Sequence, residues 1–482
     1  MNIPGTAAIC RPPDRAYLAK RANDPQSADP LGMVFSPEWT MRTADGAEIP
    51  VYATPANAGS PIAVSTGCIS FCSVVRSSAE ISGEELILYA EHADALQEVR
   101  ILPEGAPVTG RLEGDKFVLR VKGCARFVLE ANRRPGAPLF VSVEEVCPAP
   151  DLQDPAVLYY PPGVHLVDQI ALQSGQTLYI DKGAVLRAKP PEETPINACD
   201  WAAQPNYGPF ISARNQENIT ITGGGIIDTS LLPWHARGTI FLAGCRHVRI
   251  SNITTVNAAS WTVHLFDLED VQLENLKIYG YRTNSDGIDL VNCRRVSVRD
   301  CLVRTGDDGI CLKSTDPRKI GGADVVVENC AVWNDKARCL GITCETRSDI
   351  YNVLFKNCDI LHSYPKWAME LGSLCVIVCD SGHIHDIVFE DIRIAHEDHY
   401  AVCVAQMKDF WSKEKTVGKI SRITFRRVSI PAGVPSLIQG YDAEHPVNDV
   451  LFEDVRVGDR TAMCPEDIQL HRQYSDIRFT AD

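Results

Sequence analysis

Three aspartates in the middle of the chain have the residue type and spacing needed for acid–base chemistry. Asp307 and Asp308 are adjacent in "RTGDDGICLKS" (304–314), and Asp286 lies 21 residues before Asp307 in "TNSDGIDL". Aspartate is disfavoured in strands, and neighbouring carboxylates raise one another's pKa. A protonated carboxyl beside an ionised one supplies a general acid and a general base near neutral pH. The alternative interpretation is a set of solvated turn aspartates.

A recurring strand motif explains how distant aspartates are brought together. Each copy alternates apolar residues, and the copies begin at Val248, Val271, Val296, Val325, Val353, Ile387, Ile423 and Val450, with an earlier one at Ile219. A repeat of this length with period-two alternation predicts stacked strands, and therefore a parallel β-helix. Each copy ends at a corner that tolerates left-handed backbone, at Asn252, Asn275, Asp300, Asn329, Asn357 and Asp391. The residues that follow form a predicted inward column, Ile253, Leu276, Cys301, Cys330, Cys358 and Ile392.

Residues 1–150 lack this repeat. They contain strand-like runs separated by Pro, Gly and Asp turns, which predicts a small antiparallel β-sandwich. The segment 147–157 is interpreted as a linker, and 151–482 as the β-helix domain. The predicted fold class is therefore all-β, a right-handed parallel β-helix with an N-terminal antiparallel β-sandwich domain.

Charge and composition exclude some partners. The net charge of −15 argues against nucleic acid and anionic membranes as partners. No run of 18 apolar residues is present, and the N-terminus shows no signal peptide, so a cytoplasmic location is expected. If a leader has been trimmed, the expectation becomes a secreted or periplasmic protein. The 18 cysteines fit a reducing compartment when they are buried thiols.

Stacked coils predict where the carboxylates meet. Neighbouring strands of a sheet lie about 4.8 Å apart, and "NSDGIDLVN" matches "TGDDGICLKS" on the next coil. The alignment places Asp286 above Asp307, with Asp308 beside them. At least one of the three should have a raised pKa because like charges are crowded together.

The run 261–314 resembles the polygalacturonase-like glycoside hydrolases of family 28, with "NSDG" in place of Asn-Thr-Asp and "GDD" in place of Gly-Asp-Asp. The architecture also resembles the dextranase and isopullulanase group of family 49, which carries a preceding β-sandwich. This resemblance implies that Asp307 is the general acid and that Asp286 and Asp308 activate a water. The implied reaction is an inverting hydrolysis, with carboxyl groups about 6.5–9.5 Å apart. Asn284 would orient the group by hydrogen bonding, and no cofactor is implied.

Departures from the family pattern bear on the substrate. In "ARCLGITCE" Arg338 stands where polygalacturonases carry a histidine, and in "WAMELGS" Glu370 replaces a basic residue that grips the substrate carboxylate. A neutral sugar at the cleaved position is therefore predicted. Glu345 and Glu370 are expected on the same face as sugar ligands, or as plain surface charges. Lys313 is expected to bind substrate or to neutralise the acidic residues, and Arg338 to bind substrate or to pair with Asp335 or Glu345.

Aromatic residues near these positions are candidates for sugar stacking, although each taken alone is more often a packing residue. Trp333 and Trp367 are predicted to bind substrate, and the further candidate platforms are Trp261, Tyr281 and Tyr364.

A second group contains the residue types of a zinc site, Cys375, Cys379, His383 and His385. Their spacing matches no standard finger, so buried thiols and a loop are favoured and no metal is predicted.

The predicted function is an inverting glycoside hydrolase that acts on an oligosaccharide or polysaccharide with a neutral sugar at the cleaved position. In the cytoplasm it would trim imported oligosaccharides, which favours exo action. The alternatives are a polygalacturonase, another enzyme on the same scaffold (a lyase, an epimerase or a glycosyl transferase), and a non-catalytic carbohydrate-binding β-helix. The sequence predicts neither the sugar nor the oligomeric state.

Overall fold

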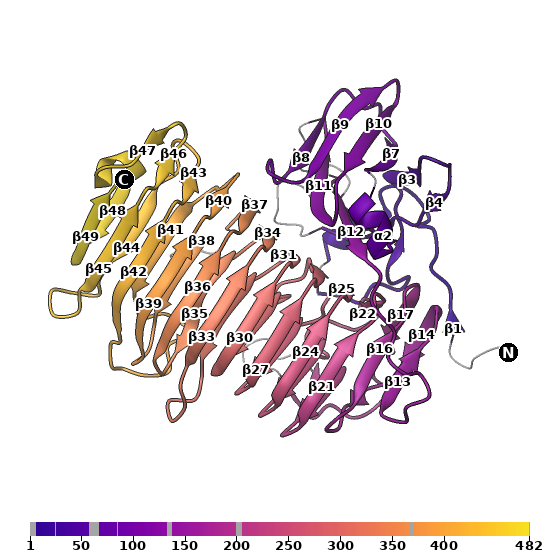
Figure 1. Ribbon diagram of the computed structural model, residues 1–482. Helices are drawn as coiled ribbons and strands as arrows, with labels where there is room; N and C mark the ends of the chain where they lie inside the picture. Colours follow the sequence, from indigo (N-terminus) through magenta and orange to yellow (C-terminus); the bar gives the residue numbers. More distant parts are fainter. Residues whose placement is uncertain are drawn as a thin grey trace.

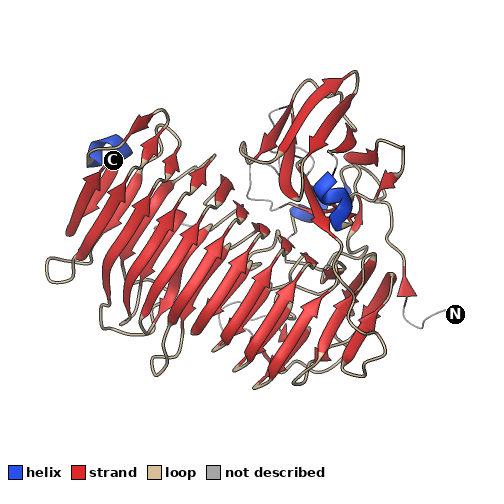
Figure 2. Ribbon diagram, in the orientation of Figure 1, coloured by secondary structure: helices blue, strands red, loops and turns tan. Residues whose placement is uncertain are grey.

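The computed structural model describes residues 6–24, 26–56, 67–83, 85–132, 137–198, 205–365 and 371–481. Within these ranges strands dominate (Figure 2). The helices described are α1 (Tyr17–Ala22), α2 (Ser78–Gly83) and the 3-10 helix η2 (Pro465–Ile468). None of them is long and apolar enough to cross a membrane.

Most of the chain winds into a right-handed parallel β-helix, as the repeat predicts. Each coil adds one strand to each of three sheets (Figure 1). Sheet I contains β1 (Thr6–Ala7), β14 (Gly163–Val167), β17 (Ala184–Ala188), β22 (Ile226–Asp228), β25 (Thr254–Val256), β28 (Lys277–Tyr279), β31 (Leu302–Thr305), β34 (Ala331–Asn334), β37 (Asp359–Ser363), β40 (Arg393–Ile394), β43 (Ser429–Ile430), β46 (Arg456–Val457) and β47 (Arg460–Thr461).

Sheet II follows sheet I along each coil and contains β15 (Ile170–Ala171), β20 (Ile211–Arg214), β23 (Ile240–Ala243), β26 (Val263–Phe266), β29 (Ile288–Val291), β32 (Ile310–Ser314), β35 (Leu340–Thr346), β38 (Gly372–Val378), β41 (Tyr400–Gln406), β44 (Ser436–Gln439) and β48 (Leu470–Gln473). Sheet III completes the coil and contains β13 (Val157–Tyr160), β16 (Thr177–Ile180), β21 (Glu217–Thr222), β24 (Arg246–Ser251), β27 (Glu269–Glu274), β30 (Cys293–Arg299), β33 (Gly322–Glu328), β36 (Ile350–Lys356), β39 (His383–Glu390), β42 (Lys419–Arg426), β45 (Val447–Glu453) and β49 (Ser475–Thr480). A separate two-stranded ladder joins β18 (Asn197–Ala198) and β19 (Pro205–Asn206).

The predicted inward column is confirmed, since all six of its residues are at most 1% exposed and lie in one hydrophobic core. Stacked phenylalanines extend that core through sheet III, at Phe355, Phe389, Phe425, Phe452 and Phe479. All six predicted corner residues have positive φ angles. Their amides bond in pairs, because Asn275 donates to Asn252 at 2.9 Å and Asn357 donates to Asn329 at 2.8 Å. The aspartate at position 300 interrupts this ladder and bonds Arg126 instead.

The N-terminal strands form two packed sheets. The first contains β4 (Glu48–Ile49), β3 (Trp39–Thr43), β7 (Leu86–His92), β10 (Lys116–Val121) and β9 (Val108–Glu113), and the second β2 (Val34–Phe35), β5 (Tyr52–Pro55), β6 (Cys68–Arg76), β12 (Leu139–Glu145), β11 (Ala125–Ala131) and β8 (Val99–Leu102). Side chains from both sheets share one core. The pair β6–β12 is parallel, which departs from the predicted antiparallel order because the chain crosses to the other sheet between these strands. We propose a domain boundary near residue 150, where the strand partners change.

The N-terminal sheets pack on the outer face of sheet I (Figure 1). Phe140 meets Tyr279 and Trp333 in this interface. Lys277 Nζ lies 2.7 Å from Glu144 Oε2, and His362 Nε2 lies 2.6 Å from Glu130 Oε1. The contact therefore combines apolar packing with a buried ion pair and a buried hydrogen bond.

Trp333 is a correction to the predicted substrate-binding set. Its ring is fully buried between the N-terminal sheets and sheet I, and its Nε1 donates to Asp335 at 3.0 Å. No ring face is left for a sugar. The candidate platforms Tyr281 and Tyr364 are likewise buried.

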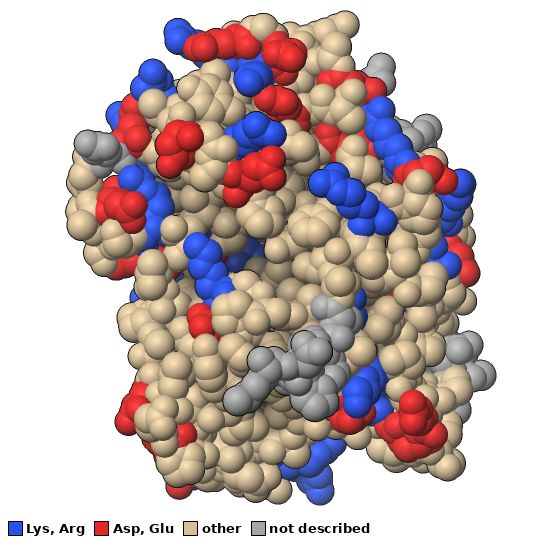
Figure 3. All heavy atoms as spheres, turned by 90° about the vertical axis from the view of Figure 1, so that its right-hand side faces the viewer, with Lys and Arg blue, Asp and Glu red and all other residues tan. Residues whose placement is uncertain are grey.

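Charges of both signs are interspersed on the face shown in Figure 3. Lysine and arginine side chains alternate there with aspartate and glutamate, so the negative net charge does not gather into one patch on this face.

Candidate active site

The turns that join sheet I to sheet II carry the three predicted carboxylates. Asp286 lies between β28 and β29, and Asp307 and Asp308 lie between β31 and β32. These turns stack because backbone bonds continue through them: Gly287 N donates to the Asp308 carbonyl at 2.8 Å, and Gly309 N to the Arg338 carbonyl at 2.8 Å. Side chains from successive coils are therefore held side by side.

The stacking differs by one residue from the sequence expectation. Ile288 pairs with Ile310, so Asp286 stacks on Asp308 rather than on Asp307. The register aligns the Asp-Gly-Ile sequence that both turns contain. Asp307 stands one residue earlier, over Ser285, whose hydroxyl accepts a bond from Gly306 N at 3.1 Å. Asp286, Asp308 and Arg338 consequently occupy equivalent places on three coils.

Lys313 is the cation at the centre of the cluster. Its Nζ lies 3.0 Å from Asp286 Oδ2, 2.8 Å from Asp289 Oδ1 and 3.3 Å from Asp308 Oδ2. Of the two roles expected for Lys313, the contacts show the neutralising one. The side chain is 5% exposed, so these interactions are formed away from bulk solvent. Burial strengthens them, and it also makes removal of the cation costly.

Asp307 is held by backbone donors. Asn284 N donates to its Oδ2 at 3.1 Å, and Asp308 N donates to its Oδ1 at 3.0 Å. Asn284 has a φ of 60°, which turns its N–H toward the carboxylate. Its side-chain oxygen lies 3.2 Å from His235 Nε2. The orienting bond expected from Asn284 therefore comes from its backbone rather than from its amide.

Asp308 is bound on both oxygens. Arg338 Nη1 lies 3.4 Å from Oδ1, and the Thr343 hydroxyl donates to Oδ2 at 3.1 Å. Arg338 therefore pairs with Asp308, whereas Asp335 pairs with Arg304.

The two adjacent aspartates have opposite pKa shifts. Burial, reinforced by the charge of Asp308, raises the pKa of Asp307 to about 6. Burial also acts to raise the pKa of Asp308, but Lys313 and Arg338 outweigh it and hold that pKa below its usual value. Burial raises the pKa of Asp289 to about 7 and that of Asp286 well above its usual range, despite Lys313. Within the adjacent pair Asp308 is thus the ionised residue, and Asp307 is the one that carries a proton at mildly acidic pH.

The carboxylates are closer together than expected. One oxygen from each of Asp286, Asp307 and Asp308 lies within 4.8 Å of the others. The expected separation was about 6.5–9.5 Å. Two of the residues are adjacent and two share the Lys313 ammonium, which draws the group together. An oxygen pair at this spacing can hold one water between them, because each hydrogen bond spans about 2.5–3.0 Å.

Asp289 is a site residue that sequence reasoning missed. It is fully buried on β29, between Ile288 and Leu290, and contacts Lys313. The available signal was an aspartate inside an apolar strand, three residues after Asp286. Thr343 was also missed, and no pattern in the sequence distinguishes it from other strand threonines.

Trp261 covers the edge of the cluster. Lys313 Nζ lies 4.1 Å from the centroid of its ring, which is a cation–π contact. The neighbouring His264 bonds the Trp261 carbonyl, and burial lowers its pKa to about 3, so it is neutral. A Cβ at Gly238 would lie 2.8 Å from the His264 ring, so only glycine permits this approach.

Three further residues are candidates for binding substrate, Glu345, Trp367 and Glu370. Glu345 is half-buried on β35, two residues after Thr343. Trp367 and Glu370 lie outside the described residues.

Metal-ligating side chains gather in three places within the described ranges. One is the aspartate cluster itself, one is Glu38 with His92 and Asp94, and one is Cys344 with Cys379 and Asp409. The four residues weighed for zinc in the sequence do not form a group. Cys375 belongs to sheet II, whereas His383 and His385 belong to sheet III and bond Ser421 and Asp386.

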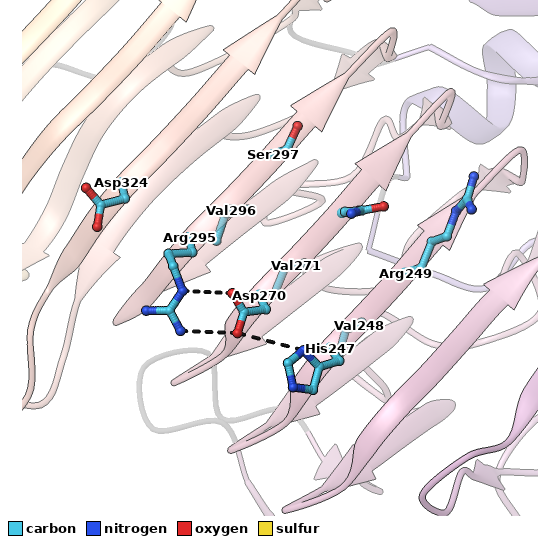
Figure 4. A pocket seen from close by; sticks show the side chains of 10 residues that line it. His247, Val248, Arg249, Asp270, Val271, Arg295, Val296, Ser297 and Asp324 are labelled. Carbon is cyan, nitrogen blue, oxygen red and sulfur yellow. Dashed lines mark hydrogen bonds and ion pairs between the residues drawn. The ribbon is translucent and has the colours of Figure 1, made fainter.

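A shallow hollow on the outer face of sheet III holds exposed charged side chains, in contrast to the buried aspartate cluster (Figure 4). Arg295 Nε donates to Asp270 Oδ1 at 2.7 Å, and His247 Nδ1 lies 3.8 Å from the other oxygen of that carboxylate. These side chains reach across successive strands and are substantially exposed.

Comparison with known proteins agrees with this arrangement. A model of "Glycosyl hydrolases family 28" matches residues 158–465. A probable polygalacturonase from Vitis vinifera is 29% identical over 181 residues, 33% of this chain and 37% of the relative. Polygalacturonase QRT2 from Arabidopsis thaliana is 20% identical over 276 residues, 52% of this chain and 60% of the relative. The chain thus spans between about a third and three fifths of these relatives.

Two solved structures share the fold. The exopolygalacturonase from Thermotoga maritima has a TM-score of 0.53 at 17% identity, and covers 67% of this chain and 83% of its own. Dex49A from Penicillium minioluteum has a TM-score of 0.55 at 11% identity, and covers 94% of this chain and 96% of its own. At these identities the likeness concerns the fold alone.

Proposed function

We propose, from the premise that this chain belongs to glycosyl hydrolases family 28, that it hydrolyses glycosidic bonds of an oligosaccharide or polysaccharide at the Asp286–Asp307–Asp308 cluster. The observation that carries the proposal is the opposite pKa shift of two adjacent carboxyls. Asp307 retains a proton up to about pH 6, while Asp308 is ionised. An acid and a base are thus available at the same pH.

The proposed reaction inverts the anomeric centre. Asp307 gives its proton to the glycosidic oxygen, and the bond between that oxygen and the anomeric carbon breaks. A water bound between Asp308 and Asp286 attacks the same carbon from the opposite face and gives its proton to Asp308. Within the described residues no donor reaches Asp286 Oδ1, which leaves that atom available to the water.

The electrostatics of the cluster support a neutral sugar at the cleaved position. The two cations that contact the carboxylates are already engaged, Lys313 with three of them and Arg338 with Asp308. A substrate carboxylate would have to compete with the protein's own for these cations, and it would add a negative charge beside the ionised Asp308.

A galacturonide is the second candidate substrate. It is favoured by the names of the relatives, two of which are a probable polygalacturonase and an exopolygalacturonase. Arg338 would then be the group to recruit, because its Nε is buried without a hydrogen-bond partner among the described residues.

The test is a product screen on neutral and uronic oligosaccharides with wild type and Asp307→Asn, following the first product's anomeric configuration by NMR. A neutral sugar released with inverted configuration, and not released by the variant, is the expected result. Release of galacturonic acid would keep the acid–base roles and overturn the neutral substrate. Retained configuration would overturn the water-attack step and make one carboxylate a nucleophile, and unsaturated products would identify a lyase.

The cytoplasmic location stays a prediction. The described cysteines are free thiols and most are buried, which fits a reducing compartment. Cell fractionation of the native host tests it, and recovery of the protein from the medium or periplasm would contradict it.

A further inference from the structure

Two thiols and a carboxylate converge at the edge of sheet II, one coil beyond the aspartate cluster. Cys344 lies on β35, Cys379 follows β38, and Asp409 follows β41, so the three side chains come from three successive coils. One ligand atom from each lies within 4.8 Å of the other two. Cys344 Sγ donates to Asp409 Oδ2 at 3.3 Å.

These thiols differ from the cysteines of the inward column. Cys301, Cys330 and Cys358 point into the hydrophobic core, and each donates to the carbonyl two residues earlier. Cys344 is only half-buried, and its acceptor is a carboxylate. The packing role that explains the inward column therefore does not explain Cys344.

The carboxylate is held in place independently of the thiols. Asp409 Oδ1 accepts bonds from Trp411 N at 2.7 Å and Ser412 N at 3.0 Å, which turns Oδ2 toward Cys344. Lys408 Nζ, next to Asp409, donates to the Cys379 carbonyl at 2.9 Å and ties the loop to the preceding coil. Hydrogen bonds within the protein thus already hold the three ligand atoms close together before any ion binds.

We propose that Cys344, Cys379 and Asp409 bind a thiophilic divalent metal ion, of which zinc is the physiological example. Zinc takes thiolate and carboxylate ligands at about 2.3 and 2.0–2.2 Å in a tetrahedron, which separates a sulfur from an oxygen by roughly 3.6 Å. The observed 3.3 Å between Cys344 Sγ and Asp409 Oδ2 is close to that separation. Binding replaces two thiol protons, which leave to solvent, and a water fills the fourth position.

The site would fix the end of β35 beside the aspartate cluster. Thr343, adjacent to Cys344, donates to Asp308 Oδ2, and Glu345 is the next residue along the strand. An ion on Cys344 ties this strand end to the two following coils. The proposal does not depend on the proposed function, since it rests on a different set of residues.

The test measures metal uptake by the full chain kept reduced with a phosphine. The protein is equilibrated with Zn²⁺, dialysed, and its zinc content is measured by mass spectrometry. Titration with Cd²⁺ then follows the thiolate charge-transfer absorption. We expect one equivalent per chain in wild type, and at least tenfold weaker binding in Cys344→Ser and in Cys379→Ser.

Two further variants separate the site from general thiol reactivity. Asp409→Asn keeps both thiols and should weaken binding while retaining the Cd²⁺ absorption at higher concentration. Cys464→Ser is the matched control, because Cys464 also donates to a carboxylate, Asp467 Oδ2 at 3.3 Å, but has no second thiol in a group of metal-ligating residues within the described ranges. It should bind like wild type. The absence of uptake by reduced wild type, or unchanged uptake in Cys344→Ser, would overturn the proposal. So would a Cys344–Cys379 disulfide in protein isolated without reductant, if reduction then restores no metal binding.

Discussion

Two faces of the β-helix arrange charges from successive coils in the same way but in different surroundings. On sheet III Arg295 pairs with Asp270 across neighbouring strands, with side chains 45% and 36% exposed. On sheet II Lys313 pairs with Asp289 across neighbouring strands, with side chains 5% and 0% exposed. The stacking geometry is common to both, so burial is what distinguishes them.

Burial changes what these pairs can do. An exposed pair is worth about 0–1 kcal/mol, because water screens the charges. A buried group of carboxylates cannot all ionise, so its members divide into protonated and ionised ones. That division is the observed difference between Asp307 and Asp308. The chemistry thus depends on the turn that hides the charges, and the repeat only supplies the spacing.

The largest expected effect is loss of turnover in Asp308→Asn. An amide cannot accept the water's proton, so kcat should fall about 10³-fold, within the range of about 10²–10⁴ typical of a general base. Steady-state kinetics on the substrate found in the product screen measure it. The matched control is Asp270→Asn on sheet III, which should keep wild-type kcat. A variant Asp308→Asn with more than a tenth of wild-type kcat would contradict the assigned role.

The next effect is on stability. Lys313→Met leaves three buried carboxylates without their shared cation, which should lower the free energy of unfolding by about 3–5 kcal/mol at neutral pH. Arg295→Met removes the cation of the exposed pair and should cost about 0–1 kcal/mol. Denaturant unfolding of both variants makes the comparison. Equal losses of unfolding free energy in the two variants would show that burial does not distinguish the two faces.

The sequence predicts the scaffold well because every copy of the repeat carries the same structural pattern. Alternating apolar residues and Asn or Asp corners recur in most coils, so the inward column and the left-handed corners could be located residue by residue. The family resemblance and the parallel β-helix are likewise confirmed. An alignment error of one residue in a single coil would leave this pattern recognisable.

Single-residue details of the site had no such redundancy. The one-residue slip at Asp286 arose because the following turn offers two adjacent aspartates, Asp307 and Asp308, and only the strand pairing Ile288–Ile310 decides between them. Trp333 was misplaced because alternation tells inward from outward but not which outward face is covered, and the N-terminal sheets cover sheet I. Asp289 was missed because its partner, Lys313, is on another coil.

The third prediction concerns the pH dependence of kcat/KM. Asp307 must be protonated to act as the acid, and its pKa is about 6, so kcat/KM should fall about tenfold per pH unit above that value. Asp308 must be ionised and its pKa is lowered, so the acidic limb should lie below the usual aspartate range of about 3.9. A pH–rate profile in constant ionic strength measures both limbs. A flat profile from pH 6 to 8 would remove Asp307 as the acid.

The smallest effect is a change in stability with pH in Asp307→Asn. The pKa of Asp307 is about 6 in the folded protein and about 3.9 when unfolded, so folding binds a proton and wild-type stability falls as pH rises from about 4 through 6. The asparagine does not ionise and escapes this loss, worth about 1–3 kcal/mol.

The absolute stability of Asp307→Asn also contains an opposing contribution. Its amide can accept only one of the two backbone bonds that Asn284 and Asp308 now donate to the carboxylate. That loss is independent of pH. The informative quantity is therefore the Tm of the variant minus that of wild type, which should increase between pH 4.5 and 7.5 by a few degrees. Asp270→Asn on sheet III is the control, and its difference from wild type should not rise over this range. A constant difference for Asp307→Asn would mean that its carboxyl is already ionised at pH 4.5, and the distinction between the two faces would then not extend to this residue.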